Sequence, residues 1–202
     1  AQIVETGRKA AILEPLEQTR IQAGVPDLWL LFAPVKRQKT DLMVEKATEL
    51  GVARLCPVST ARTQSERVRI DRFRTIAKEA AEQTERLDLP EIDELERLDR
   101  VLDGWDPARR LIYCDEAGDE AGEPWGGARG RGQPMAAALA GLEAGPAAIL
   151  IGPEGGFSDA ERTRLRDHDF VTPVTLGPRI LRAETAAMAA LVLWQSVHGD
   201  WR

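Results

Sequence analysis

Continuous apolar runs alternate with helix-spaced apolar residues along most of the chain. Runs at 28–35, 54–58, 110–114 and 147–151 predict strands that are covered on both faces, and a further strand is expected at 171–176. Between and after them, apolar residues recur at helical spacing. We expect helices from about 41 to 50, from 69 to 88 and from 135 to 142, a helix that begins after Ser158, and a closing helix at 184–197. This alternation predicts an α/β fold with a mostly parallel sheet and helices on both faces.

Several residues mark where these elements should begin or end. Thr40 or Asp41 can cap the first helix, and Gly51 is expected to end it. Ser158 and Glu161 have the spacing of a capping box at the start of another helix. Pro173 suggests that the last strand lies at an edge or that the strand starts there.

Two segments do not fit the alternating pattern. Residues 1–20 read as two short strands around a turn at Gly7, too short to bury a core of their own, and a linker follows at 22–27. The start of the chain resembles mid-strand sequence, so we expect an N-terminal portion to be missing. Residues 115–134 are rich in Gly, Pro and charge, and a loop of this length is usually functional or disordered.

Composition narrows the class of protein. The chain has 202 residues, room for one α/β domain and a fragment of a second, and no apolar run approaches the roughly 20 residues that span a bilayer. The first residues lack a signal-peptide layout. Cys56 and Cys114 lie far apart in strand-like runs and form no metal-ligand cluster, so we expect buried, reduced thiols in a cytoplasmic protein and no metal site.

The net charge of −6 argues against a protein that binds nucleic acid with its whole surface. A local basic patch can nevertheless coexist with an acidic whole. The N-terminal half contains two such clusters, one with Lys36, Arg37 and Lys39, the other with Arg62, Arg67, Arg69, Arg72 and Arg74.

Two glycine-containing loops follow buried strands, at 152–156 (GPEGG) and 177–186 (GPRILRAETA). Ligands of parallel α/β folds sit outside the carboxyl ends of the strands, where glycine lets the backbone approach a ligand closely. A tight turn before a helix and a phosphate-binding nest are alternative interpretations of GPEGG. Neither a GxxxxGK[ST] motif nor a strand-linked GxGxxG occurs, which disfavours nucleotide hydrolases and Rossmann enzymes.

Longer motifs around these loops resemble one known family. The segments LIGPEGGFSDAE (150–161) and VTLGPRILRAETAAMAAL (174–191) look like the paired cofactor loops of the RsmE family of SPOUT RNA methyltransferases. The stretches KRQKTDLMVEKATELGVARLCPVSTARTQ (36–64) and EAAEQTERLDLPEI (79–92) are similar to further blocks of that family. The resemblance covers roughly residues 28–197.

The resemblance implies a fold and an activity. It implies a methyltransferase domain over 28–202 with a C-terminal trefoil knot, a rare exception to the rule that chains do not thread loops. Residues 1–22 would be the tail of a PUA-like RNA-binding β domain. The enzyme would be a cytoplasmic homodimer that uses S-adenosylmethionine to methylate N3 of a uracil in 16S ribosomal RNA, in the assembled small subunit, without a membrane or DNA partner.

The family's motifs also suggest roles for individual residues. Arg182 would stabilise negative charge that develops on the uracil oxygens, and Glu184 would act as base or orient Arg182. Glu184 has an alternative interpretation as an acidic residue that favours the helix dipole. Glu154 could shape the pocket or only bond backbone donors. The cofactor would be held by Ile151, Gly152, Pro153, Glu154, Gly155, Gly156, Leu176, Gly177, Ile180, Leu181, Arg182, Thr185 and Ala186.

Basic and polar residues upstream are candidates for RNA contacts. Phosphates could be held by Lys36, Lys39, Lys46 and Arg62, while Gln83 and Arg86 could reach the target nucleotide or a dimer partner. A solvated charged face is the alternative interpretation. Asp115 and Glu116 occupy a third strand end and are either pocket residues or exposed. Competing functions are methylation of a ribose hydroxyl or of guanine N1 by another SPOUT enzyme, and a non-catalytic RNA-binding assembly factor.

Overall fold

A parallel sheet of eight strands forms the centre of the protein in a computed structural model, which describes residues 1–19, 21–65, 67–115 and 132–201. The strand order is β5-β4-β3-β9-β7-β10-β8, with β6 also paired to β4, and every pairing in this sheet is parallel. The strands are β3 (Leu28–Phe32), β4 (Arg54–Ser59), β5 (Glu91–Ile92), β6 (Glu96–Arg97), β7 (Arg110–Cys114), β8 (Gln133–Pro134), β9 (Ala147–Ile151) and β10 (Val171–Thr175). The predicted α/β class is confirmed.

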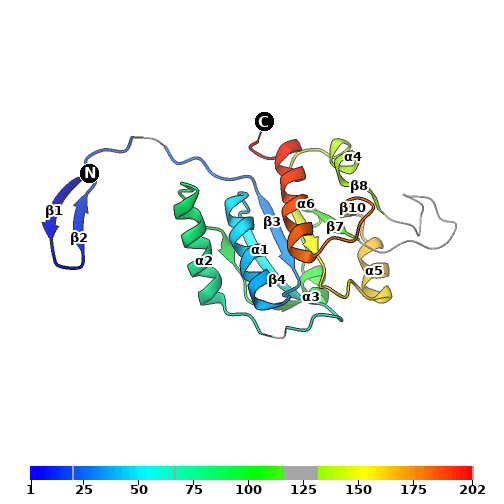
Figure 1. Cartoon of the computed structure of the whole chain (residues 1–202). Coiled ribbons are helices and arrows are strands. Elements are labelled where there is room, and N and C mark those ends of the chain that lie inside the picture. Colours follow the sequence, from blue (N-terminus) through cyan, green and yellow to red (C-terminus); the bar gives the residue numbers. More distant parts are fainter. Residues whose placement is uncertain (20, 66, 116–131, 202) are drawn as a thin grey trace.

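Helices cover both faces of the sheet, and this explains the continuous apolar runs (Figure 1). On one face lie α1 (Arg37–Glu49), α2 (Ile70–Gln83), α4 (Met135–Ala140) and α6 (Ala183–Val197), and on the other lie α3 (Leu98–Asp103) and α5 (Asp159–Arg166). Successive residues of the central strand β9 point alternately into the two cores: Ile149 into the first and Leu150 into the second. Every residue of β9 is therefore buried.

The element boundaries follow local hydrogen bonding. Helix α1 begins at Arg37, and neither Thr40 nor Asp41 caps it, so that prediction is wrong. The Thr40 hydroxyl instead donates to the Val35 carbonyl (3.1 Å) and accepts from the Val35 amide (3.0 Å), which fixes the turn between β3 and α1. Gly51 ends α1 with a φ of 77°, as predicted.

Three further predictions, two about where helices begin or end and one about Pro173, have different outcomes. Helix α2 ends at Gln83 rather than at residue 88, because Glu85 adopts a left-handed φ of 57°. The capping box of Ser158 and Glu161 is confirmed at the start of α5. Pro173 pairs in register with Tyr113 inside β10, which begins at Val171 and lies between β7 and β8, so the prediction of an edge strand or a strand start at Pro173 is wrong. The ladder to β8 begins only at Val174, so the missing amide hydrogen of Pro173 removes no hydrogen bond of that ladder.

The N-terminal strands form a separate two-stranded antiparallel hairpin, β1 (Gln2–Thr6) with β2 (Ala11–Glu14). Every residue of both strands is exposed, and an extended segment separates the hairpin from β3 (Figure 1). The expectation that this segment buries no core of its own is confirmed.

Within the described part of the chain, no helix has the length and apolar character needed to cross a bilayer.

Both cysteines are buried, as the sequence predicts. Burial, the largest cause, raises the pKa of the Cys56 thiol, so Cys56 stays protonated at neutral pH. Most of the predicted 115–134 loop lies outside the described residues.

Candidate functional site

The two glycine-containing loops meet around one cavity of about 530 Å³. They leave the carboxyl ends of β9 and β10, and the start of α1 completes the wall. Ligand pockets of parallel α/β folds form at this edge of the sheet. The cavity is lined by Lys36, Lys39, Cys114, Asp115, Ile151, Gly152, Pro153, Glu154, Gly156, Val174, Thr175, Leu176, Gly177, Arg179, Ile180, Leu181, Arg182, Ala183 and Ala186.

Glycine is required at two points of these loops. A Cβ atom on Gly152 would lie 2.5 Å from the ring of Phe157, so only glycine lets this ring pack against the loop. Gly177 adopts a φ of 117°, which side-chain-bearing residues rarely reach. Both positions therefore depend on the missing side chain for the shape of the cavity wall.

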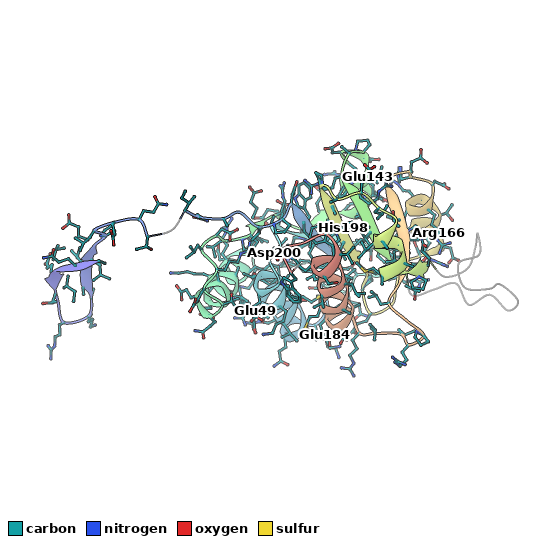
Figure 2. The ribbon with its side chains drawn as sticks, turned by 90° about the horizontal axis from the view of Figure 1, so that it is seen from above. Glu49, Glu143, Arg166, Glu184, His198 and Asp200 are labelled. Carbon is teal, nitrogen blue, oxygen red and sulfur yellow. The ribbon has the colours of Figure 1, made fainter. Side chains whose placement is uncertain are left out.

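A cluster of three charged side chains joins the two loops to α1. The Lys39 ammonium lies 2.5 Å from Glu154 Oε1 and 4.0 Å from Glu184 Oε1. Glu184 lies at the start of α6 (Figure 2), and its buried Oε2 has no hydrogen-bond partner among the described residues. The hydrogen bond from Lys39 is the main cause of the lowered pKa of Glu154, and the charges of Lys36 and Arg182 add to it. Two carboxylates thus face one ammonium here.

The predicted cofactor residues converge on the cavity with two exceptions. Gly155 lies beside it, where its carbonyl accepts a hydrogen bond from Arg62 Nη1 (2.8 Å), and Thr185 is exposed on the first turn of α6. Arg182 lines the cavity, whereas Glu184 does not and lies near Lys39 instead. Lys39 therefore lies in the cavity wall, and Glu184 lies behind Lys39, outside the wall.

The predicted RNA-contact residues separate into two groups. Lys36 and Lys39 line the cavity, and Arg62 lies next to it. Lys46 pairs with Glu45 (2.7 Å) and Glu49 (2.8 Å) near the end of α1. Gln83 is exposed at the end of α2, and no polar contact of its side chain is found among the described residues.

The donors of Arg86, a predicted RNA or dimer contact, are used inside the protein. The Arg86 side chain is only 8% exposed. Its guanidinium donates to the carbonyls of Thr48 (2.7 Å) and Val52 (2.9 Å) and pairs with Asp88. Arg86 therefore satisfies carbonyls at the end of α1, which a single sequence could not reveal.

The third strand end contributes a structural ion pair to the wall. Asp115 lines the cavity, but its fully buried carboxylate pairs with Arg162 (3.3 Å) and Arg166 (2.8 Å) of α5. Glu116 lies outside the described residues. Sequence reasoning did not assign Cys114, Val174, Thr175, Arg179 and Ala183 to the cavity. The position of the first three at the carboxyl ends of strands was the available signal.

Sequence comparison gives one family match, which covers residues 23–195: the RNA methyltransferase domain family. Among relatives, the chain is 32% identical over 163 residues to the ribosomal RNA small subunit methyltransferase E of Bacillus subtilis. That alignment covers 77% of this chain and 60% of the relative, so the chain spans less than two thirds of this relative's length.

Comparison with solved structures gives the same family and a wider fold group. A ribosomal RNA small subunit methyltransferase E from Neisseria gonorrhoeae, bound to S-adenosyl methionine, superposes with a TM-score of 0.71 at 25% identity, covering 89% of this chain and 70% of the other. The SpoU methyltransferase AviRb from Streptomyces viridochromogenes matches with a TM-score of 0.53 at 20% identity, over 83% and 59% of the two chains, and this likeness concerns the fold alone.

Proposed function

We propose, from the premise that this chain belongs to the RNA methyltransferase domain family, that it transfers a methyl group from S-adenosylmethionine to N3 of a uracil in 16S ribosomal RNA. One observation carries the proposal: the two glycine-containing loops predicted to hold the cofactor line the same cavity. The relative named for small-subunit ribosomal RNA and the Neisseria structure bound to S-adenosyl methionine support the substrate and the cofactor. This function implies work on ribosomes in the cytoplasm.

The residues of the cavity fit this cofactor. A volume of about 530 Å³ lies within the range of roughly 300–1,000 Å³ that is usual for small-molecule sites. Ile151, Leu176 and Leu181 offer apolar contacts for an adenine ring, and the loop backbone offers amides and carbonyls. The cations in the wall, Lys36, Lys39, Arg179 and Arg182, offer donors to the carboxylate of the cofactor's methionine part. When bound, S-adenosylmethionine supplies an electrophilic methyl group.

The residues of the chain then have to assist removal of the N3 proton and stabilise the negative charge that results. N3 of uracil carries a proton at neutral pH, and its loss leaves negative charge on the ring oxygens. Arg182 lines the cavity and can stabilise that charge. The geometry supports Glu184 as a positioning residue for Lys39 better than as the base, because Lys39 is the group that lines the wall.

The test is to incubate small ribosomal subunits with the purified chain and S-adenosylmethionine labelled in its methyl group, and then analyse the nucleosides of the RNA by mass spectrometry. We expect labelled N3-methyluridine. Arg182→Ala should lower turnover about 100-fold or more, as loss of a charge-stabilising donor does in other enzymes, while cofactor affinity changes much less. Arg100→Ala, which removes an exposed arginine on α3, is the matched control.

Each alternative function predicts a different outcome of this experiment. Label on a ribose hydroxyl or on guanine N1 would indicate another SPOUT specificity. Cofactor binding by calorimetry without methyl transfer would contradict the proposed reaction, and absence of both would favour the assembly factor. Near-normal turnover of Arg182→Ala would remove Arg182 from the mechanism.

We also infer three finer features from the resemblance. The first is a C-terminal trefoil knot. In its support, β10 lies beyond β7 while α6 returns to pack on β9 and α1, so the chain crosses back over the sheet. The second is a homodimer, which sedimentation equilibrium can check. The third is a division between an accessory β segment at 1–22, part of a PUA-like domain, and the methyltransferase domain at 28–202.

A further inference from the structure

A groove extends from the cavity along the start of α1. A hollow of about 300 Å³ shares Lys36, Pro153 and Glu154 with the main cavity. A second hollow of about 170 Å³ continues from the first, with which it shares Pro34, Val35, Arg37 and Ser65. The three hollows are therefore neighbours along the start of α1, and we call the two outer hollows the basic groove.

Two cationic clusters that are separate in sequence meet in the basic groove. Lys36 and Arg37 come from the start of α1, and Arg62, Arg67 and Arg69 come from the segment between β4 and α2. Such a concentration of positive charge is notable in a protein with a net charge of −6. It indicates a local partner with negative charge.

Among the residues that the structure describes, the two carboxylates that line the groove are paired with other cations. Glu154 is paired with Lys39 at 2.5 Å, and Asp41 is held by Arg72 through two-pronged hydrogen bonds of 2.7–2.9 Å. Arg37 has only a long contact of 4.0 Å to Asp41 and is about two-thirds exposed. The groove thus keeps cations whose donors are available to a ligand.

The individual side chains are presented differently. Arg62 is held at the boundary with the cavity, because one of its nitrogens donates to the Gly155 carbonyl at 2.8 Å. Arg67 and Arg69 are exposed, and within residues 1–19, 21–65, 67–115 and 132–201 no ion pair of Lys36, Arg67 or Arg69 is found. The aromatic ring in the groove, Phe73, is 3% exposed and cannot stack on a base.

We propose that the basic groove binds the backbone phosphates of a single-stranded RNA segment next to the target base and guides that base into the cavity. This inference rests on the proposed function and adds the path of the substrate. Phosphate contacts fix the register of a nucleic acid without reading its sequence, which matches a groove rich in arginine and without an exposed aromatic ring. Enzymes that modify a base need it unstacked, as single-stranded RNA allows.

The experiment measures binding of a fluorescent 12-nucleotide oligouridylate to the full chain by anisotropy at several salt concentrations. Arg67→Gln/Arg69→Gln removes two cations from the groove. Arg97→Gln/Arg100→Gln removes two exposed cations near the start of α3 and is the matched control. We expect about tenfold weaker binding by the groove variant at low salt. We also expect the slope of log K against log salt to fall by about 0.7 for each lost phosphate contact.

Two further measurements distinguish an effect of the lost charges from an effect of misfolding. Arg67→Lys/Arg69→Lys keeps the charges and should retain most of the affinity. Calorimetry with S-adenosylmethionine should give the same cofactor affinity for all variants, because neither Arg67 nor Arg69 lines the cavity.

Equal weakening in the groove and control variants would overturn the inference, as would an unchanged salt slope in the groove variant. Tighter binding of polyglutamate or of duplex RNA than of the oligouridylate would also overturn it, in favour of that partner. Groove-dependent RNA binding without methyl transfer by the unmodified chain would reject the proposed function instead. Normal methyl transfer with groove-independent binding would reject the groove alone.

Discussion

Lys39 connects three segments that are far apart in the sequence. It comes from α1, and its ammonium lies between Glu154, in the loop after β9, and Glu184, at the start of α6. Without Lys39, the buried Glu184 carboxylate would lose the ammonium that lies 4.0 Å away, and Glu154 would lose its hydrogen-bond donor. An uncompensated buried charge is strongly unfavourable, so the loops would have to move or a proton would have to bind.

Replacement of Lys39 by Met should therefore weaken S-adenosylmethionine binding by about tenfold or more, in line with the loss of a charge-assisted hydrogen bond. Lys39→Arg should recover part of the affinity. Isothermal titration calorimetry checks both variants, with circular dichroism to show that they are folded. Equal cofactor affinities of Lys39→Met and the unmodified chain would contradict this role.

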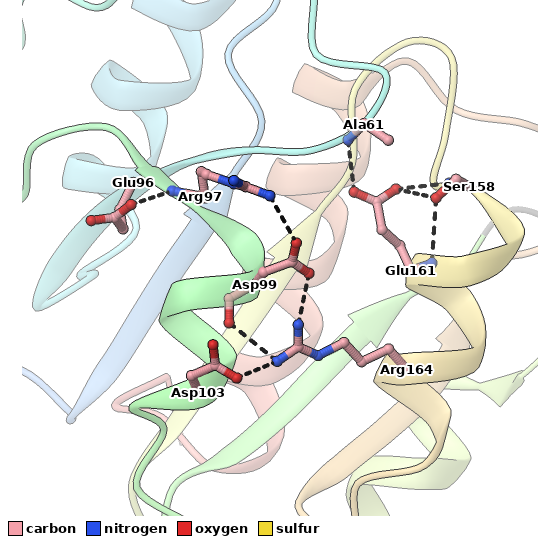
Figure 3. Close-up of polar contacts among 8 residues, drawn as sticks. All are labelled: Ala61, Glu96, Arg97, Asp99, Asp103, Ser158, Glu161 and Arg164. Atoms are coloured by element: carbon pink, nitrogen blue, oxygen red, sulfur yellow. Dashed lines mark hydrogen bonds and ion pairs between the residues drawn. The ribbon is translucent and has the colours of Figure 1, made fainter.

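At the scale of elements, the start of α5 is held by its capping box and by a neighbouring loop (Figure 3). The Ser158 hydroxyl accepts from the Glu161 amide, and the Glu161 carboxylate accepts from the Ser158 amide (2.8 Å) and from the Ala61 amide (2.7 Å). On the same helix, Arg164 pairs with Asp99 and Asp103 of α3. The helices on this face are thus tied to each other and to the segment after β4.

Ser158→Ala should lower the free energy of unfolding by about 1 kcal/mol, the usual effect of losing an N-cap. Glu161→Ala should cost more, because it also leaves the Ala61 amide without its acceptor. Urea denaturation measures both changes. Thr163→Ala, at an exposed position of the same helix, is the control and should have a smaller effect. A larger loss in Thr163→Ala than in Ser158→Ala would refute the role of the cap.

The pair of Arg86 and Asp88 links the segment after α2 to the end of α1. The hydrogen bond with Arg86 is the main cause of the lowered pKa of Asp88. A lowered pKa in the folded protein means that the pair stabilises the fold above the ordinary pKa of an aspartate, about 3.9. This stabilisation is lost as the pH falls through the lowered value.

Asp88→Asn should therefore destabilise the protein at pH 7, and its difference from the unmodified chain should shrink as the pH falls from about 5 to below 3. Thermal unfolding at a series of pH values measures this convergence. Asp71→Asn, which removes a carboxylate that is 94% exposed, should show little difference at any pH. A gap for Asp88→Asn that stays constant with pH would exclude the ion pair as its cause.

The elements that could be predicted are those whose pattern is repeated over several residues. The five long strands and the helices α1, α2, α4 and α6 follow from their apolar pattern, because burial on one or two faces imposes it. Helix α5 follows from its capping box. The strands β5, β6 and β8 have two residues each, too few to show a period. The capping role assigned to Thr40 failed because its hydroxyl has an equally local alternative at Val35.

At the scale of the whole molecule, the sequence predicted which loops form the cavity but not every side chain that faces it. The carboxyl ends of parallel strands share one edge, so the convergence of the segments at 152–156 and 177–186 follows from the fold class. The placement of Lys39 in the wall depends on how α1 packs, and the internal role of Arg86 depends on the end of α1 lying beside residue 86. Such relations need tertiary structure.

The position of α6 has a consequence for the nascent chain. The buried side chain of Gln195 donates to the Leu50 carbonyl, 145 residues earlier, and β3 pairs with β9 in the middle of the sheet. At about 5–20 residues per second, α1 emerges from the translation machinery roughly 7–30 seconds before the helix that covers it. During that interval Met43, Val44 and Ala47 have no final partner in the closing helix. Chaperone capture and the rate of synthesis should therefore influence the yield of native protein.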